Sequence, residues 1–227
     1  RGTGNRLYRN DAGMAFTDVT SEAGVREGSF GWGASFGDLD NDGDLDLYHV
    51  NGWIQNEREG DPMEFNNQPA RLFKNLGDGS FEEVAQEVGA GNKGQGRGVI
   101  LFDFDNDGDL DLYITNYKRL AMRDSLPPPV LSFENTLMEL TNNRWIVMPP
   151  FNQHYETEVR NNILLRFEMA EVDQFYLNNG KGEFEFVDIT QGRFTDENGQ
   201  PINHHLRDWG LMAQFRDINN DSHPDIY

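Results

Sequence analysis

The stretch FGDLDNDGDLDLYHVN, residues 36–51, sets the pattern of the chain. It recurs as FDFDNDGDLDLYITN at residues 102–116 and, less faithfully, as FRDINNDSHPDIY at residues 215–227. We call residues 38–46, 103–111 and 217–225 the first, second and third acidic loops. Positions one, three, five and nine of the three loops hold Asp38, Asp40, Asp42 and Asp46, then Asp103, Asp105, Asp107 and Asp111, then Asp217, Asn219, Asp221 and Asp225.

Four carboxylates so close together repel one another unless a cation neutralises them. Calcium takes six to eight oxygen ligands at about 2.3–2.6 Å, and side chains at positions one, three and five of a tight loop can all turn inward. The Asp at position nine would complete the ligand set, and the position-seven carbonyl would add an oxygen. Those position-seven residues are Asp44, Asp109 and His223.

The type of ligand and the sequence around it narrow the choice of metal and loop. No soft ligand is present, which favours calcium over zinc or copper, and magnesium prefers a smaller octahedral shell. An EF-hand needs Glu at position twelve, where this chain has His49 and Ile114. The residues after each loop are β-branched and aromatic, so we expect strands around a nine-residue calcium loop. The alternative is a solvated acidic turn without metal, which suits the third loop best, since it has Ser222 where the others have glycine.

A second phrase recurs between the acidic loops. It begins at Asn5, Ala70 and Asp173, and each copy has a short strand, a glycine-containing turn and a second strand built on an aromatic residue. Each acidic loop adds an incoming and an outgoing strand, so one loop and one hairpin predict four antiparallel strands. The first two loops start 65 residues apart, and the next start follows after 114. Such spacing predicts an all-β chain of four-stranded blades in a β-propeller.

The whole chain, residues 1–227, is expected to be a single, partial propeller domain, with residues 118–172 inserted in the second repeat. It starts with a hairpin that lacks a loop and ends with a loop that lacks a hairpin, so we expect it to be part of a longer chain. In the insertion, an apolar or aromatic residue recurs every four positions, which predicts a short amphipathic helix. These residues are Tyr155, Val159, Ile163 and Phe167. The insertion would carry function or serve as a lid over one face.

Composition bounds the partners and the location. The formal net charge is −20, and 13 of the 39 acidic residues lie in the three loops, which argues against nucleic acid. The sequence has no cysteine and no apolar run long enough to span a membrane. Loops of this kind suit millimolar calcium, so we expect an exported protein: extracellular, at the cell surface or periplasmic.

These phrases together resemble the FG-GAP/VCBS repeat family, whose repeats also form integrin α-subunit propellers. Within that family the chain looks most like bacterial relatives of the cartilage acidic protein group, which often carry an ASPIC/UnbV domain. The resemblance covers most of residues 5–90, 96–117 and 173–227. It implies a calcium-stabilised propeller, usually seven-bladed, on exported proteins that bind proteins or glycans. It also implies five ligand positions in each loop, with calcium in the first two loops and the third as a further candidate.

Two functions are open at this stage: a recognition or scaffold module for protein or glycan, and a polysaccharide lyase or hydrolase built on a calcium propeller. The enzyme would need a base or an acid pair, for which the candidates are His154, His204, His205, Glu156 and Glu158. No nucleophile, zinc-protease or phosphate-loop motif appears. Sugar-stacking candidates are Trp32, Trp53, Trp145 and Trp209, although Trp32 and Trp209 are expected in the core. We therefore favour binding and assign no catalytic residue.

Overall fold

The computed structural model describes residues 4–52, 68–118, 122, 126–141, 144–190, 194–202, 205–207 and 209–227. Its regular structure is almost entirely β, as predicted, and it also contains the short α-helix α2 (Phe133–Thr136) and the 3-10 helix η2 (Phe151–Gln153). In the described residues, no helix is long and apolar enough to cross a membrane.

The first four-stranded sheet has the order β3-β4-β5-β6, with every neighbouring pair antiparallel. Its strands are β3 (Gly31–Gly37), β4 (Asp46–Asn51), β5 (Arg71–Asn75) and β6 (Phe81–Glu83). The first acidic loop joins β3 to β4, and the repeated hairpin supplies β5 and β6. This confirms that one loop and one hairpin combine into four antiparallel strands.

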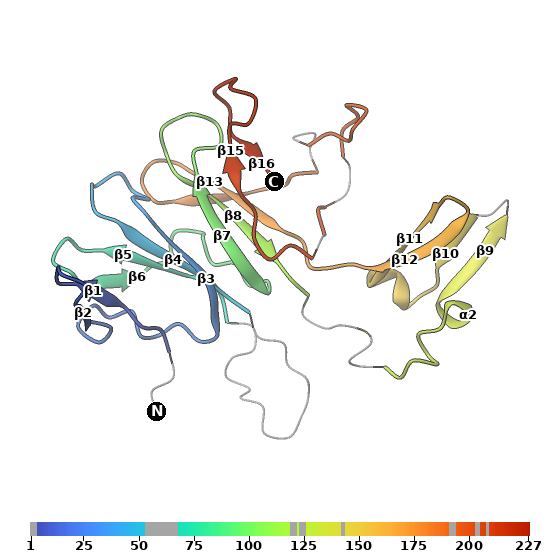
Figure 1. Ribbon diagram of the computed structural model, residues 1–227, viewed down its shortest axis with the longest axis horizontal. Coiled ribbons are helices and arrows are strands. Elements are labelled where there is room, and N and C mark those ends of the chain that lie inside the picture. Colours follow the sequence, from blue (N-terminus) through green and yellow to red (C-terminus); the bar gives the residue numbers. More distant parts are fainter. Residues whose placement is uncertain are drawn as a thin grey trace.

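The second four-stranded sheet repeats this arrangement with the order β7-β8-β13-β14, again antiparallel throughout. Its strands are β7 (Gly96–Phe102), β8 (Asp111–Asn116), β13 (Gln174–Asn178) and β14 (Phe184–Val187). The insertion lies between β8 and β13 in the sequence, yet these two strands still pair side by side (Figure 1).

The main hydrophobic core lies between the two sheets. Strands β4 and β8 are buried at all six positions, because their β-branched and aromatic side chains have packing partners on both faces. Tyr48 and Val50 of β4 belong to the same core cluster as Leu112 and Ile114 of β8, and all four are fully buried. The Tyr48 hydroxyl donates to the Ala90 carbonyl at 2.5 Å, which satisfies its polar end. The sheets are therefore neighbours that share one core.

Two further strand pairs flank these sheets. At the N-terminal side, β1 (Tyr8–Asn10) pairs with β2 (Phe16–Asp18), and at the C-terminal side β15 (Phe215–Arg216) pairs with β16 (Asp225–Ile226) around the third acidic loop. Phe215 stacks on Phe102 of β7 with ring centroids 3.4 Å apart. Figure 1 shows β15 and β16 beside the second sheet.

The insertion contains two hairpins, where the sequence analysis predicted an amphipathic helix. Strand β9 (Leu137–Thr141) pairs with β10 (Arg144–Val147), and β11 (Tyr155–Arg160) pairs with β12 (Ile163–Glu168). The helix prediction was wrong because Asn161 and Asn162 adopt positive φ angles of 52° and 61°, which close a two-residue hairpin turn. Both hairpins lie to one side of the four-stranded sheets (Figure 1).

Candidate metal centres

The first acidic loop is closed by hydrogen bonds from its own backbone. The Asp38 carboxylate accepts the amides of Asp42 and Gly43 at 3.1 and 3.0 Å. The Asp42 carboxylate accepts the amide of Asp44 at 3.0 Å. Gly43 has a φ of 94°, which side-chain-bearing residues rarely adopt, so the glycine permits this turn. These hydrogen bonds fix the carboxylates of Asp38 and Asp42, at positions one and five, against the backbone of the loop.

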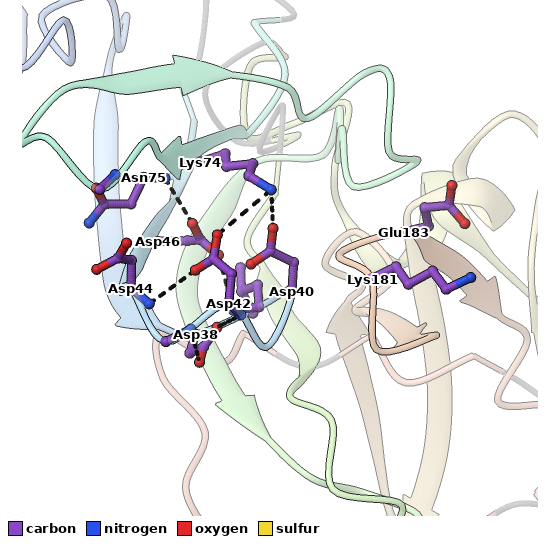
Figure 2. A network of polar contacts seen from close by, with 12 residues as sticks. Asp38, Asp40, Asp42, Asp44, Asp46, Lys74, Asn75, Lys181 and Glu183 are labelled. Atoms are coloured by element: carbon purple, nitrogen blue, oxygen red, sulfur yellow. Dashed lines mark hydrogen bonds and ion pairs between the residues drawn. The ribbon is translucent and has the colours of Figure 1, made fainter.

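Asp46, at position nine, connects the loop with the hairpin of the same sheet. It begins β4, is 1% exposed, and accepts the amide of Leu39 at 3.0 Å and the amide of Asn75 at 2.9 Å. Figure 2 shows Asp46 between the loop and Asn75 of β5. Burial raises the pKa of the Asp46 carboxyl, while the two backbone donors act in the opposite direction.

The second acidic loop repeats the same hydrogen-bond scheme. Its acceptors are Asp103, Asp107 and Asp111, and its donors are the amides of Asp107, Gly108, Asp109, Phe104 and Asn178, at 2.8–3.1 Å. Burial raises the pKa of the Asp111 carboxyl to about 6, partly offset by the amides of Asn178 and Phe104. Burial, followed by repulsion from Asp107, raises the pKa of Asp105. A bound cation would offset the burial and the charge repulsion that raise the pKa of these two carboxyls.

The third acidic loop keeps the scheme despite its divergent sequence. Asp217 accepts the amides of Asp221 and Ser222 at 3.2 and 2.9 Å, and Asp225 accepts the amide of Ile218 at 2.9 Å. Ser222 adopts a φ of 69° where the other loops have glycine. The backbone of this loop therefore matches the other two, although one residue occupies a strained conformation.

Carboxylates converge in the first two loops. Ligand atoms of Asp38, Asp40 and Asp42 lie within 4.8 Å of one another, and those of Asp103, Asp105 and Asp111 do likewise. In the described part of the chain, no such group forms in the third loop. The acidic groups in these two loops can hold a metal ion. The position-seven side chains stay outside both groups: Asp44 and His223 are exposed and Asp109 is half-buried.

One carboxylate oxygen of Asp40 is buried without a hydrogen-bond partner. Its Oδ1 is inaccessible to solvent and has no hydrogen-bond partner, while its Oδ2 binds the ammonium of Lys74. An unpaired buried carboxylate oxygen is costly, and a cation among the loop carboxylates would satisfy it. The all-oxygen donor set and this orphaned atom both fit a hard divalent cation.

Lys74 was missed by the sequence analysis. Its Nζ binds Asp40 and lies 3.9 Å from Asp42 Oδ2, and Figure 2 shows it reaching across both carboxylates. The signal was available in the repeated hairpin phrase, where the first sheet reads RLFKN and the second reads QFYLN. A lysine thus faces one loop and Leu177 occupies the equivalent place at the other.

The candidate catalytic residues are only partly brought together. Glu156 and His205 line one cavity of about 720 Å³ between β11–β12 and residues 205–207, together with Trp209. Exposed Glu158 pairs with Arg160 at 2.8 Å. Burial, followed by repulsion from Lys118, lowers the pKa of half-buried His154. His204 lies outside the described residues.

The tryptophans do not form the expected core. Trp32 is 54% exposed and packs against the Arg97 guanidinium, 4.2 Å from its ring centroid. Trp209 is half-buried and donates from its indole nitrogen to the Glu168 carbonyl at 2.6 Å. The core expectation was wrong for Trp32, because its ring remains half-exposed and lies beside Phe30 and the Arg97 guanidinium. Trp145 is half-buried in β10, and Trp53 lies outside the described residues.

Comparison with known proteins agrees with the loop geometry. The FG-GAP-like repeat model matches residues 1–49 and 64–114, which contain the first two acidic loops. Cartilage acidic protein 1 of Homo sapiens is 35% identical over 105 residues, and its Mus musculus counterpart is 34% identical. Each match covers 46% of this chain and 14% of the relative, so the similarity spans about one seventh of those proteins. Over these two repeats, the chain is similar to the FG-GAP-like repeat family.

Proposed function

We propose that the chain is a calcium-binding module in which the first and second acidic loops each hold one calcium ion. The observation that carries this proposal is the buried, unpartnered Oδ1 of Asp40 beside two further carboxylates in a loop closed by its own amides. The third loop is a further candidate site, supported by its matching backbone.

The residues that would hold calcium are those at positions one, three, five and nine, with the position-seven carbonyl. Bound calcium neutralises carboxylates that otherwise repel one another. Asp46 and Asp111 would transmit this effect, because each also binds a hairpin amide in its own sheet. We expect calcium to stiffen the edge of each sheet by fixing the loop against the neighbouring strand.

We further propose that the sheets are blades of a β-propeller, part of a seven-bladed ring, that presents a recognition surface for protein or glycan outside the cell. The shared core between the two sheets and their repeated topology support a radial arrangement. Similarity to proteins named cartilage acidic protein, together with loops suited to millimolar calcium, supports an extracellular setting.

Calcium binding is tested by isothermal titration calorimetry of the wild type and of variants that remove one ligand pair. The proposal predicts that D38N/D40N removes one binding event and that D103N/D105N removes another. An unchanged number of sites in either variant would contradict it. The recognition role is tested by probing glycan and extracellular-protein arrays in calcium and in chelator, with calcium-dependent capture as the expected result.

A polysaccharide-active enzyme is the alternative, and one observation favours it: Glu156, His205 and Trp209 share a cavity. Glu168 also lines that cavity, but its carboxylate already binds the Lys118 ammonium at 2.8 Å and the Met122 amide at 2.6 Å. A pair that used Glu168 would need it to leave both partners, so Glu156 and His205 are the candidate acid–base pair. Polysaccharide cleavage that is lost in E156Q, with the fold intact, would establish the enzyme; we expect no cleavage by the wild type.

A further inference from the structure

The two acidic loops differ in one charged contact. Lys74 of β5 binds Asp40 and approaches Asp42, so the first loop already has a cation among its carboxylates. In the described part of the chain, no carboxylate of the second loop forms an ion pair with lysine or arginine. The first loop is therefore partly neutralised without metal, and the second loop is not.

Strand register shows that Lys74 and Leu177 are equivalent positions. Leu47 lies opposite Phe73 in the first sheet, and Leu112 lies opposite Tyr176 in the second. The next residue is Lys74 in one sheet and Leu177 in the other. Each is followed by an asparagine whose amide binds the position-nine carboxylate at 2.9 Å. The sequence difference therefore falls at the same place relative to each loop.

Leu177 points its apolar side chain into a local core. It packs against the cluster that contains Phe102, Tyr113 and Phe175, and so it contributes no charge to the second loop. The Lys74 side chain is 40% exposed, whereas that of Asp40 is only 10% exposed. The ammonium thus covers Asp40 from the solvent side.

We propose that Lys74 is a tethered counter-ion that weakens calcium binding at the first loop, so that the second loop binds calcium more tightly. This inference rests on the proposed calcium function. A calcium ion bound by Asp40 and Asp42 must either displace the ammonium or tolerate a like charge beside it. Both routes reduce affinity at the first loop, and neither applies at the second.

The asymmetry gives the loops different tasks. The first loop keeps Asp40 and Asp42 together through Lys74 when calcium is scarce. The second loop has no such substitute and relies on the metal. As calcium rises, the second loop fills first and the first loop fills over a higher range, so the protein responds to calcium in two steps.

The test is a calcium titration of the protein labelled with ¹⁵N-glycine, with NMR spectra recorded at each calcium concentration. Gly43 and Gly108 each donate an amide to the position-one carboxylate of their own loop, so their signals report the two sites separately. In the wild type, Gly108 should shift at lower calcium than Gly43. In K74M, the Gly43 midpoint should fall about three- to tenfold while Gly108 stays in place. K74R keeps the charge and should leave the order of filling unchanged.

A reciprocal variant checks the same point at the other loop. L177K should raise the Gly108 midpoint, and L177M is its matched control for altered packing. The inference is overturned if K74M leaves the Gly43 midpoint unchanged or raises it, or if Gly43 fills first in the wild type. If neither glycine responds to calcium in any variant, the proposed calcium function itself fails, which is a separate outcome.

Discussion

Asn41 in the first acidic loop donates from its side chain to the Asp109 carboxylate of the second loop, at 2.7 Å. These residues occupy position four and position seven of their loops. The same pair of positions meets again one loop further on, where Asn106 contacts His223 at 3.0 Å. Each loop is therefore tied to the next by one side-chain contact, in the same direction along the chain.

This contact predicts coupling between the loops. Replacing Asn41 by alanine leaves Asp109 without its donor, so N41A should destabilise the protein by about 0.5–1.5 kcal/mol and weaken calcium binding at the second loop. A double-mutant cycle with D109N, followed by thermal unfolding, measures the coupling. Additive effects of the two substitutions would show that the contact carries no energy.

His49 of β4 is a buried polar side chain without a hydrogen-bond partner in the first sheet. It is 4% exposed, and neither ring nitrogen has a hydrogen bond of normal geometry, although the nearby Gly28 backbone favours the charged form. Burial, followed by repulsion from Arg71, lowers the pKa of His49 to about 4. The equivalent residue in the second sheet is Ile114, which is fully buried.

We therefore expect H49I to stabilise the protein by about 1–2 kcal/mol at pH 7, because a buried unsatisfied group is removed. The pKa of His49 is about 4 in the folded protein and about 6.5 in the unfolded chain. The unfolded chain therefore binds the proton first, and the protein loses stability as pH falls from 6.5 towards 4. The gain from H49I should accordingly grow on acidification. Urea unfolding at several pH values measures this, with H49Q as the polar control. A destabilised H49I would show that the imidazole makes a necessary contact.

Substitutions of the residue after position five are expected to have opposite effects on stability in the second and third loops. Gly108 has a φ of 98° and open space where a Cβ would lie, so G108A should cost about 1–2 kcal/mol through backbone strain alone. Ser222 already sits at 69° in the third loop, and S222G should be neutral or stabilise by up to about 1 kcal/mol. Calorimetric melting compares the two variants. Equal destabilisation by both would contradict the shared loop geometry.

Asp111 predicts a pH dependence that calcium should abolish. Its pKa is raised to about 6 by burial, so the protonated carboxyl favours the folded calcium-free protein. Stability in chelator should therefore rise as pH falls from 7 towards 4, by on the order of 2 kcal/mol from this group. Calcium competes with the proton, so its dissociation constant should increase below pH 6. D111N provides the control and should flatten this part of both profiles.

Much of the fold follows from local pattern. The acidic loop, its flanking strands and the hairpin with its glycine turn recur together, so the four-stranded sheets could be predicted from three short phrases. The β11–β12 hairpin could not be predicted from apolar spacing. Tyr155, Val159, Ile163 and Phe167 fit a helical period, and the Asn161–Asn162 turn decides the outcome.

The site shows a similar limit. Spacing alone identified the carboxylates that converge, because their geometry is set within nine residues. Lys74 lies 34 residues from Asp40 in the sequence and meets it only through the pairing of β4 with β5. Contacts of this kind depend on strand register, which a loop motif does not encode.

Calcium bound to the acidic loops should stabilise the fold, and thermal unfolding tests this most directly. Calcium at a hundredfold excess over its dissociation constant adds about 2.7 kcal/mol per site, or roughly 5–10 °C in Tm for a chain of this size. We expect calcium, but not magnesium, to restore the Tm lost in excess chelator, and D38N/D103N to respond much less. An identical Tm in calcium and in chelator would contradict a structural role for calcium in these loops.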